Sequence, residues 1–114
     1  MHEVSLAASL FRIAQDALSG REGAKVLRVN VLAGALAGLM PDALCFAFDA
    51  LKPGTAFAGA EMVVRDQPVR VACGDCGQDY EPQALPCACP ACGGRLFSIL
   101  AGEDVILESL ELEE

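Results

Sequence analysis

The sequence predicts an α+β fold of the α/β type, with two helices on a small mixed sheet and an inserted cysteine-containing β-hairpin module. Two stretches, residues 5–19 and 41–51, carry apolar side chains at helical spacing. Three others, residues 25–33, 60–65 and 103–112, have the composition of strands. Two pairs of cysteines lie between the last two strands, where we expect the inserted module.

Each predicted helix has one apolar face and a recognisable end. The first would bury Leu6, Ala7, Leu10, Phe11, Ile13, Ala14, Ala17 and Leu18, and Gly20 would end it. Pro41 is suited to the first turn of the second helix, and Asp42 beside it favours the positive end of the helix dipole. The core side of this helix would be formed by Leu44, Ala47, Phe48 and Leu51.

The last predicted strand sets the domain organisation. It is too apolar to lie free in solvent, so we expect it to return to the sheet of the first domain. The alternation of apolar and polar residues along this strand is interrupted near Glu108 and Ser109, which predicts a β-bulge. The first domain would therefore consist of residues 1–68, completed by residues 101–114, with residues 69–100 as the inserted module.

Composition and charge exclude several classes of protein. With 54% apolar residues, the 114-residue chain can form a core. Its net charge of -8 disfavours a nucleic acid or an anionic membrane as the main partner. No apolar run reaches the roughly 20 residues that span a bilayer, and Met1-His2-Glu3 does not resemble a signal peptide. We therefore expect a cytoplasmic protein, whose paired cysteines are metal ligands rather than disulfides.

The cysteine pairs form two CxxCG motifs, Cys73 to Gly77 and Cys89 to Gly93. Four thiolates at this spacing are typical of a closed, structural zinc site, here on Cys73, Cys76, Cys89 and Cys92. The glycine after each motif allows a turn with positive φ, in which backbone N–H groups can face the thiolates. A rubredoxin-like iron site uses similar motifs and stays an alternative. A thioredoxin-like redox pair is disfavoured, because it would need a CxxC at the start of a helix.

Two further cysteines lie outside these motifs. Cys87 precedes the second motif by two residues and is either a spare thiol or an alternative ligand. We favour Cys89 as the ligand because only Cys89 completes a CxxCG motif. Cys45 lies in the second predicted helix, where we expect a small buried apolar side chain.

The N-terminus carries a second set of candidate ligands. The chain has one histidine, His2. The α-amine of Met1 can chelate a metal together with the backbone and imidazole nitrogens of His2, and Glu3 could add a carboxylate oxygen. Nitrogen-rich, near-planar coordination suits Ni(II) or Cu(II) better than zinc. Taken alone, the pattern is more typical of a solvated histidine followed by a carboxylate at a helix start.

The two candidate sites occur together in a known family. The start Met1-His2-Glu3-Val4-Ser5-Leu6 and the two CxxCG motifs resemble the HypA/HybF family of hydrogenase nickel-incorporation proteins. Similar segments are found at 41–44, 46–49, 54–55, 59–61 and 102–111, so the resemblance covers nearly the whole chain. Cys87 departs from the family pattern.

The resemblance implies a nickel metallochaperone that serves [NiFe]-hydrogenase maturation. Nickel would bind to His2, with Met1 and Glu3 contributing, and a structural zinc-ribbon-like module would hold zinc on its four cysteines. The implied partners are a nickel-binding GTPase accessory protein and the hydrogenase large subunit, and some members also serve urease. Some members place a further carboxylate near position 40, where Asp42 is the nearest candidate.

Two other functions are compatible with parts of the sequence. A structural zinc-ribbon adaptor without nickel function would make His2 dispensable, and a rubredoxin-like electron carrier would hold coloured iron. An enzyme is disfavoured because the sequence offers no nucleophile–base pair and the cysteine site is closed.

Overall fold

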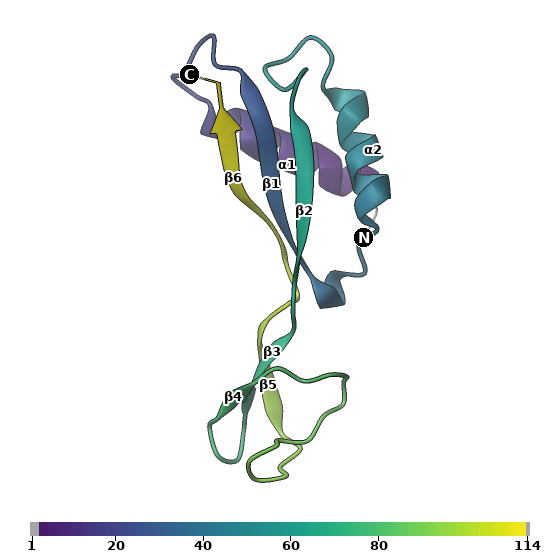
Figure 1. Ribbon diagram of the computed structural model, residues 1–114, viewed down its shortest axis with the longest axis vertical. Helices are drawn as coiled ribbons and strands as arrows, with labels where there is room; N and C mark the ends of the chain where they lie inside the picture. Colours follow the sequence, from purple (N-terminus) through teal and green to yellow (C-terminus); the bar gives the residue numbers. More distant parts are fainter. Residues whose placement is uncertain (1–2, 114) are drawn as a thin grey trace.

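A computed structural model describes residues 3–113 of the chain. The elements are α1 (Glu3–Ala17), β1 (Val26–Gly34), a short 3-10 turn η1 (Ala35–Ala37), α2 (Pro41–Leu51), β2 (Glu61–Gln67), β3 (Arg70–Cys73), β4 (Asp79–Tyr80), β5 (Phe97–Ala101) and β6 (Val105–Leu112). They form an elongated molecule of 55 × 25 × 16 Å (Figure 1).

Two separate three-stranded sheets lie along the long axis. The first has the order β2-β1-β6, with β1 parallel to β2 and antiparallel to β6. Both helices belong to this end of the molecule (Figure 1). The second sheet has the order β4-β3-β5 and is antiparallel throughout. The fold class is therefore the predicted one, and the last strand returns to the first sheet as its apolar pattern predicts.

The helices and the first sheet share one hydrophobic core. Phe48 of α2 and Phe57 of the α2–β2 connection are fully buried there. The ring of Phe11 from α1 packs against both, with centroid distances of 5.8 Å to Phe48 and 5.1 Å to Phe57. Aromatic clusters of this kind supply much of the buried apolar area in a small core, so this cluster fixes α1, α2 and the start of β2 relative to one another.

Element boundaries differ slightly from those predicted. Helix α1 begins and ends two residues earlier than residues 5–19, and Leu18 to Gly20 form a turn. The predicted turn region from Gly34 to Met40 contains the last residue of β1 and the η1 turn. The predicted bulge is confirmed. Asn30 pairs with Ser109 and Val31 with Leu107, so Glu108 is the extra residue.

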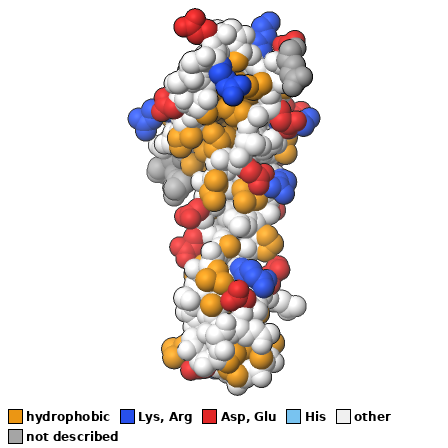
Figure 2. Space-filling model, turned by 90° about the vertical axis from the view of Figure 1, so that its left-hand side faces the viewer, with side chains coloured by type: hydrophobic (Ala, Val, Ile, Leu, Met, Phe, Trp, Pro, Cys, Tyr) orange, Lys and Arg blue, Asp and Glu red, His pale blue; other side chains and the backbone are white. Residues whose placement is uncertain are grey.

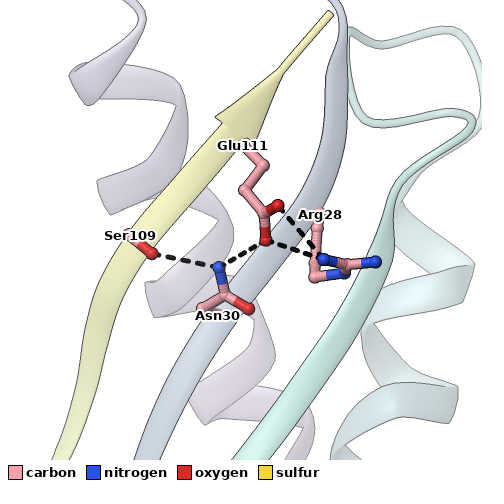
Figure 3. Close-up of polar contacts among 4 residues, drawn as sticks. All are labelled: Arg28, Asn30, Ser109 and Glu111. Carbon is pink, nitrogen blue, oxygen red and sulfur yellow. Dashed lines mark hydrogen bonds and ion pairs between the residues drawn. The ribbon is translucent and has the colours of Figure 1, made fainter.

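The uncovered face of the first sheet carries a polar network across β1 and β6 (Figure 3). The Arg28 guanidinium donates to both carboxylate oxygens of Glu111 at 3.1 and 3.0 Å. The amide of Asn30 donates to Glu111 and to Ser109, both at 3.0 Å. Hydrogen bonds from Asn30 and then from Arg28 lower the pKa of the Glu111 carboxyl. These contacts favour the bulged register of β6 over a slipped one.

A narrow waist joins the two sheets. Two strand connections pass through it, one at Pro68 and Val69 and the other at Gly102 (Figure 1). Gly102 has a φ of 105°, and a Cβ there would lie 2.8 Å from Cα of Val69. Its carbonyl accepts a hydrogen bond of 2.8 Å from the backbone N–H of Leu36 in η1. The waist is therefore close-packed backbone and not a loose linker.

Within residues 3–113, we find no helix long and apolar enough to cross a membrane.

Candidate metal centre

Four thiols from the two CxxCG motifs meet at one end of the second sheet. Cys73 ends β3, Cys76 follows in the turn toward β4, and Cys89 and Cys92 lie in the long connection between β4 and β5. Their sulfur atoms all lie within 4.8 Å of one another. The shortest contacts cross between the motifs, with 3.6 Å from Cys73 to Cys92 and 3.7 Å from Cys76 to Cys89.

The same backbone turn brings each pair of thiols into place. In the first motif, the Gly77 N–H donates to the carbonyl of Cys73 at 3.0 Å. In the second, the Gly93 N–H donates to the carbonyl of Cys89 at 2.8 Å. Both glycines have positive φ, 80° and 74°, which is the conformation predicted from the sequence. The glycine in each motif is thus required by the turn that presents the thiols.

Backbone N–H groups point at sulfur atoms of the cluster. Asp75 and Cys76 each donate to Sγ of Cys73 at 3.4 Å, and Gly94 donates to Sγ of Cys92 at 3.4 Å. The two donors from Cys76 and Asp75 lower the pKa of Cys73 to about 7. A thiolate at position 73 is therefore accessible near neutral pH, which favours metal capture.

The thiols of Cys92 and Cys76 resist ionisation without a metal. The Gly94 N–H lowers the pKa of Cys92, but the neighbouring Cys73 thiol and burial outweigh it and raise the value to about 12. The backbone N–H of Gln78 lowers the pKa of Cys76, but burial and the thiols of Cys89 and Cys73 together outweigh it and raise the value. Several thiolates so close together need a cation to compensate their charge.

The geometry fits a tetrahedral ion. Zinc–thiolate bonds of about 2.3 Å imply sulfur–sulfur separations of about 3.8 Å in a tetrahedron, and the two shortest contacts are 3.6 and 3.7 Å. A four-thiolate iron centre has the same shape. In either case the four cysteines fill the coordination sphere and leave no open position for a substrate.

The second sheet has little core apart from this cluster. Its buried residues are Val71, Cys73, Tyr80 and Cys89, so two of the four are themselves cluster cysteines. A metal ion bound at the cluster would stabilise the fold of this module, because its hydrophobic core is too small to do so alone.

Cys87 lies outside the four-thiol cluster. Its sulfur atom is 3.1 Å from the hydroxyl of Tyr80. This contact, followed by burial, raises the pKa of Tyr80 to about 12. In this geometry Cys87 is a partner of Tyr80 in the wall of the module rather than a fifth member of the cluster.

Cys45 lies on α2 against the core of the first sheet and is half-buried. Its thiol is 3.7 Å from the carbonyl of Met62, and burial followed by the charge of Asp49 raises its pKa. The side chain is thus less buried than expected, although its packing role is the expected one.

Of the three predicted N-terminal ligands, Met1 and His2 lie outside the described residues. Glu3 is the first residue of α1, and its Oε2 accepts a hydrogen bond of 3.4 Å from the backbone N–H of Met40. Met40 directly precedes α2, whose first turn holds Asp42. The start of α1 and the start of α2 therefore adjoin, which places Glu3 and the region of Asp42 on the same side of the molecule. The sequence gives no signal for the contact with Met40.

Comparisons with known proteins identify the family of this chain. A family profile described as "Hydrogenase/urease nickel incorporation, metallochaperone, hypA" matches residues 1–112. The chain belongs to the HypA family. A hydrogenase maturation factor HypA from Desulfitobacterium hafniense is 39% identical over 114 residues, and the alignment covers 100% of this chain and 100% of the relative. One from Aquifex aeolicus is 36% identical over 113 residues, covering 99% of this chain and 98% of the relative.

Solved structures of HypA proteins share the fold. The solution structure of the Ni metallochaperone HypA from Helicobacter pylori matches with a TM-score of 0.71 and 26% identity, over 98% of this chain and 97% of that one. A second solution structure of a HypA protein gives a TM-score of 0.78, also at 26% identity, over 99% and 97%. The chain is thus a member of a family of hydrogenase maturation metallochaperones, which are not enzymes.

Proposed function

We propose that this chain binds Ni(II) at its N-terminus and delivers it for [NiFe]-hydrogenase maturation, while its four-cysteine cluster holds a structural zinc ion. The observation that carries the proposal is the family match over residues 1–112, which includes both the N-terminal residues and all four cluster cysteines. The proposed zinc ligands are Cys73, Cys76, Cys89 and Cys92.

The proposed nickel ligands are His2 with Met1 and Glu3. They are consecutive residues, so they can detach from the ion one after another when a recipient offers its own ligands. The imidazole of His2 must be neutral to bind, so nickel affinity should fall as the pH drops through the histidine range. Delivery requires two properties of this site. It must bind nickel strongly enough to carry the ion, and it must release the ion stepwise.

The role of Glu3 is constrained by its contact with Met40. With Oε2 facing the N–H of Met40, this carboxylate ties the proposed nickel site to the start of α2. We therefore propose that Glu3 both positions the N-terminus and coordinates nickel, and the variants described in the Discussion separate these two roles.

The proposed partners are a nickel-binding GTPase accessory protein as the nickel source and the hydrogenase large subunit as the recipient. Urease maturation proteins are a further proposed client, and the proposed location is the cytoplasm. The net charge of -8 is compatible with partners that present basic surfaces.

A transfer experiment tests the proposal. The chain is loaded with nickel and zinc and mixed with metal-free hydrogenase large subunit, and the nickel content of the large subunit is measured after separation. Delivery by the natural chain and none by His2→Ala, with zinc retained in both, is the expected result. Equal transfer by the two proteins would show that His2 does not carry the delivered nickel. The absence of nickel binding and transfer in both would instead favour a zinc-ribbon adaptor without nickel function.

A further inference from the structure

Strand β6 forms an open edge of the first sheet. It is the last strand in the order β2-β1-β6, so only one of its two edges is paired with another strand. Within residues 3–113, no backbone hydrogen bond other than those to β1 reaches residues 105–112. The free edge therefore presents unpaired backbone N–H and C=O groups along a strand of eight residues.

The opposite edge of the same sheet is closed by α2. This helix lies beside β2 (Figure 1), and the Cys45 thiol donates to the carbonyl of Met62 at 3.7 Å. The ammonium of Lys52, directly after the helix, donates to the carbonyl of Ala60 at 2.8 Å. Within residues 3–113, no helix side chain makes such a hydrogen bond to the backbone of β6. Of the two edges, only that of β6 is open to a further strand.

An apolar hollow runs beside the free edge of β6. It has a volume of about 580 Å³ and lies between the end of α1 and β6. Figure 2 faces this side of the molecule and shows hydrophobic side chains gathered on it. We call the free edge of β6 together with this hollow the β6 edge groove. Its apolar lining residues are Ile13, Ala17, Leu18, Leu107, Leu110 and Leu112.

One uncompensated charge lies in the β6 edge groove. The two charged residues that line it are Arg21 and Glu108. Both carboxylate oxygens of Glu108 accept hydrogen bonds of 2.6 Å from Arg65 of β2, so this charge is already paired. Arg21 has no ion pair within residues 3–113. It lies in the turn before β1, whose first residue Val26 pairs with Leu112, so the free positive charge is at the Leu112 end of the groove.

We propose that the β6 edge groove binds an extended segment of a partner protein as a fourth strand of the first sheet. Side chains alternate along a strand, so every second residue of the segment would be apolar and enter the groove. A carboxylate of the segment would face Arg21. Main-chain hydrogen bonds to β6 would provide affinity, and the groove would provide specificity. A helix cannot bind in this way, because its backbone groups are used within the helix.

A second copy of the chain is a less suitable occupant. Each copy has a net charge of -8, so two copies repel each other. The carboxylates within a second β6 strand, Glu108 and Glu111, are already held by Arg65 and Arg28. They are therefore not free to pair with Arg21.

The proposed strand site is independent of the proposed nickel site. The start of α1 adjoins the start of α2 through the contact between Glu3 and Met40, whereas the β6 edge groove lies at the other end of α1 (Figure 1). Binding at β6 would therefore leave the start of α1 uncovered.

A short strand-forming peptide tests the site on the full zinc-loaded chain. The probe alternates threonine with valine and has a glutamate in place of the last valine at each end, so that a carboxylate can face Arg21 in either strand direction. NMR titration records chemical shifts, amide exchange and affinity. We expect shifts in the β6 edge groove and slowed exchange at alternate amides of β6. Replacing the glutamates by lysines should weaken binding about fivefold.

Methylation of the peptide backbone separates strand pairing from simple apolar contact. Successive N–H groups of a strand point to opposite edges. Two probes are compared, one N-methylated at the odd residues and one at the even residues. One of them should bind about tenfold more weakly than the unmodified probe, and the other within about threefold of it. Equal binding by the two methylated probes would overturn the proposal.

Variants of α1 and the following turn locate the peptide. Ile13→Ser should weaken binding about fivefold, whereas Val4→Ser, an exposed apolar side chain of the same helix outside the groove, should leave it unchanged. Arg21→Gln should weaken binding about threefold, and Arg12→Gln, which removes an exposed arginine that does not line the groove, should not. These side chains are exposed, so all four variants should keep the natural melting temperature.

Three other results would overturn the proposal. The first is a set of peptide shifts centred outside the β6 edge groove, and the second is equal affinity in Ile13→Ser and Val4→Ser. The third is a concentration-dependent dimer in which the amides of β6 become protected without peptide, because the edge would then receive a second copy.

Discussion

The backbone N–H of Met40 donates a hydrogen bond of 3.4 Å to Oε2 of Glu3, although the two residues are 37 positions apart. This contact joins the beginning of α1 to the beginning of α2. Since His2 precedes Glu3 directly, it also fixes the point from which the proposed nickel ligands extend. A carboxylate in this place has two possible roles, and they have different consequences for metal binding.

Substitutions at Glu3 separate positioning from coordination. A glutamine keeps an oxygen acceptor for Met40 but is a poor metal ligand, whereas an alanine loses both properties. If Glu3 supports nickel binding only through its contact with Met40, Glu3→Gln should retain the nickel affinity within about threefold. Glu3→Ala should lower this affinity about tenfold, which corresponds to the loss of one hydrogen bond to a charged group. Equal, large losses in both variants would assign the carboxylate to the metal instead. Nickel titration calorimetry measures the nickel affinity of both variants.

Serine variants test which cysteines hold the structural ion. Cys73→Ser removes the thiol whose pKa lies lowest and whose sulfur is 3.6 Å from Cys92, so the purified variant should contain far less than one zinc per chain. Cys87→Ser should retain about one zinc, because Cys87 contacts Tyr80 and lies outside the cluster. Metal analysis of both proteins gives the answer. Zinc loss in Cys87→Ser would show that Cys87 is a ligand, and a coloured iron-containing protein would favour the rubredoxin-like alternative.

The waist between the sheets should not tolerate a side chain at position 102. In Gly102→Ala, the new Cβ would meet the backbone of Val69 at a φ of 105° that alanine rarely adopts. We expect the free energy of unfolding to fall by about 1–3 kcal/mol. Gly59→Ala is the control, because a Cβ there meets nothing within 4 Å and the φ is not positive. Urea unfolding compares them, and equal stabilities of the two variants would contradict a close-packed waist.

The network of Figure 3 predicts a pH dependence of stability. Asn30 and Arg28 lower the pKa of folded Glu111 below its usual 4.5, so the ionised carboxylate stabilises the folded state above that value. This contribution is lost as the pH falls through the folded pKa. Acidification from pH 7 should therefore destabilise the natural chain more than Glu111→Gln, with the difference appearing only below about pH 5.

Urea unfolding at several pH values, with Glu22→Gln as the control, tests this dependence. Glu22 lies in the turn before β1, and residues 3–113 offer it no ion pair. A Glu22→Gln variant should follow the natural chain throughout. Parallel pH profiles for the natural chain and Glu111→Gln would show that the network does not contribute.

Patterns within short segments predicted most of this fold. Helical spacing identified α1 and α2 within two residues, and the slip in alternation at Glu108 located the bulge. The two CxxCG motifs predicted both the cluster of four thiols and the turns with positive φ at Gly77 and Gly93. Each of these features depends on neighbours in the sequence, which is why a sequence pattern can reveal it.

Contacts between distant segments could not be predicted in this way. The hydrogen bond between Met40 and Glu3 and the contact between Tyr80 and Cys87 depend on how packed elements meet in space. The exposure of Phe46 was missed for a similar reason. The spacing of Phe46 is compatible with a helix, but only the packing of α2 shows that this side chain faces away from the core.

The central claim is that the chain carries two separate metal sites, with nickel at His2. The most direct test is nickel titration calorimetry on the untagged natural chain and on His2→Ala, with zinc quantified in both samples. The account predicts one high-affinity nickel site in the natural chain that is lost in His2→Ala, with the zinc content unchanged. Equal nickel binding by both proteins would contradict it, because the N-terminus would then not be the nickel site.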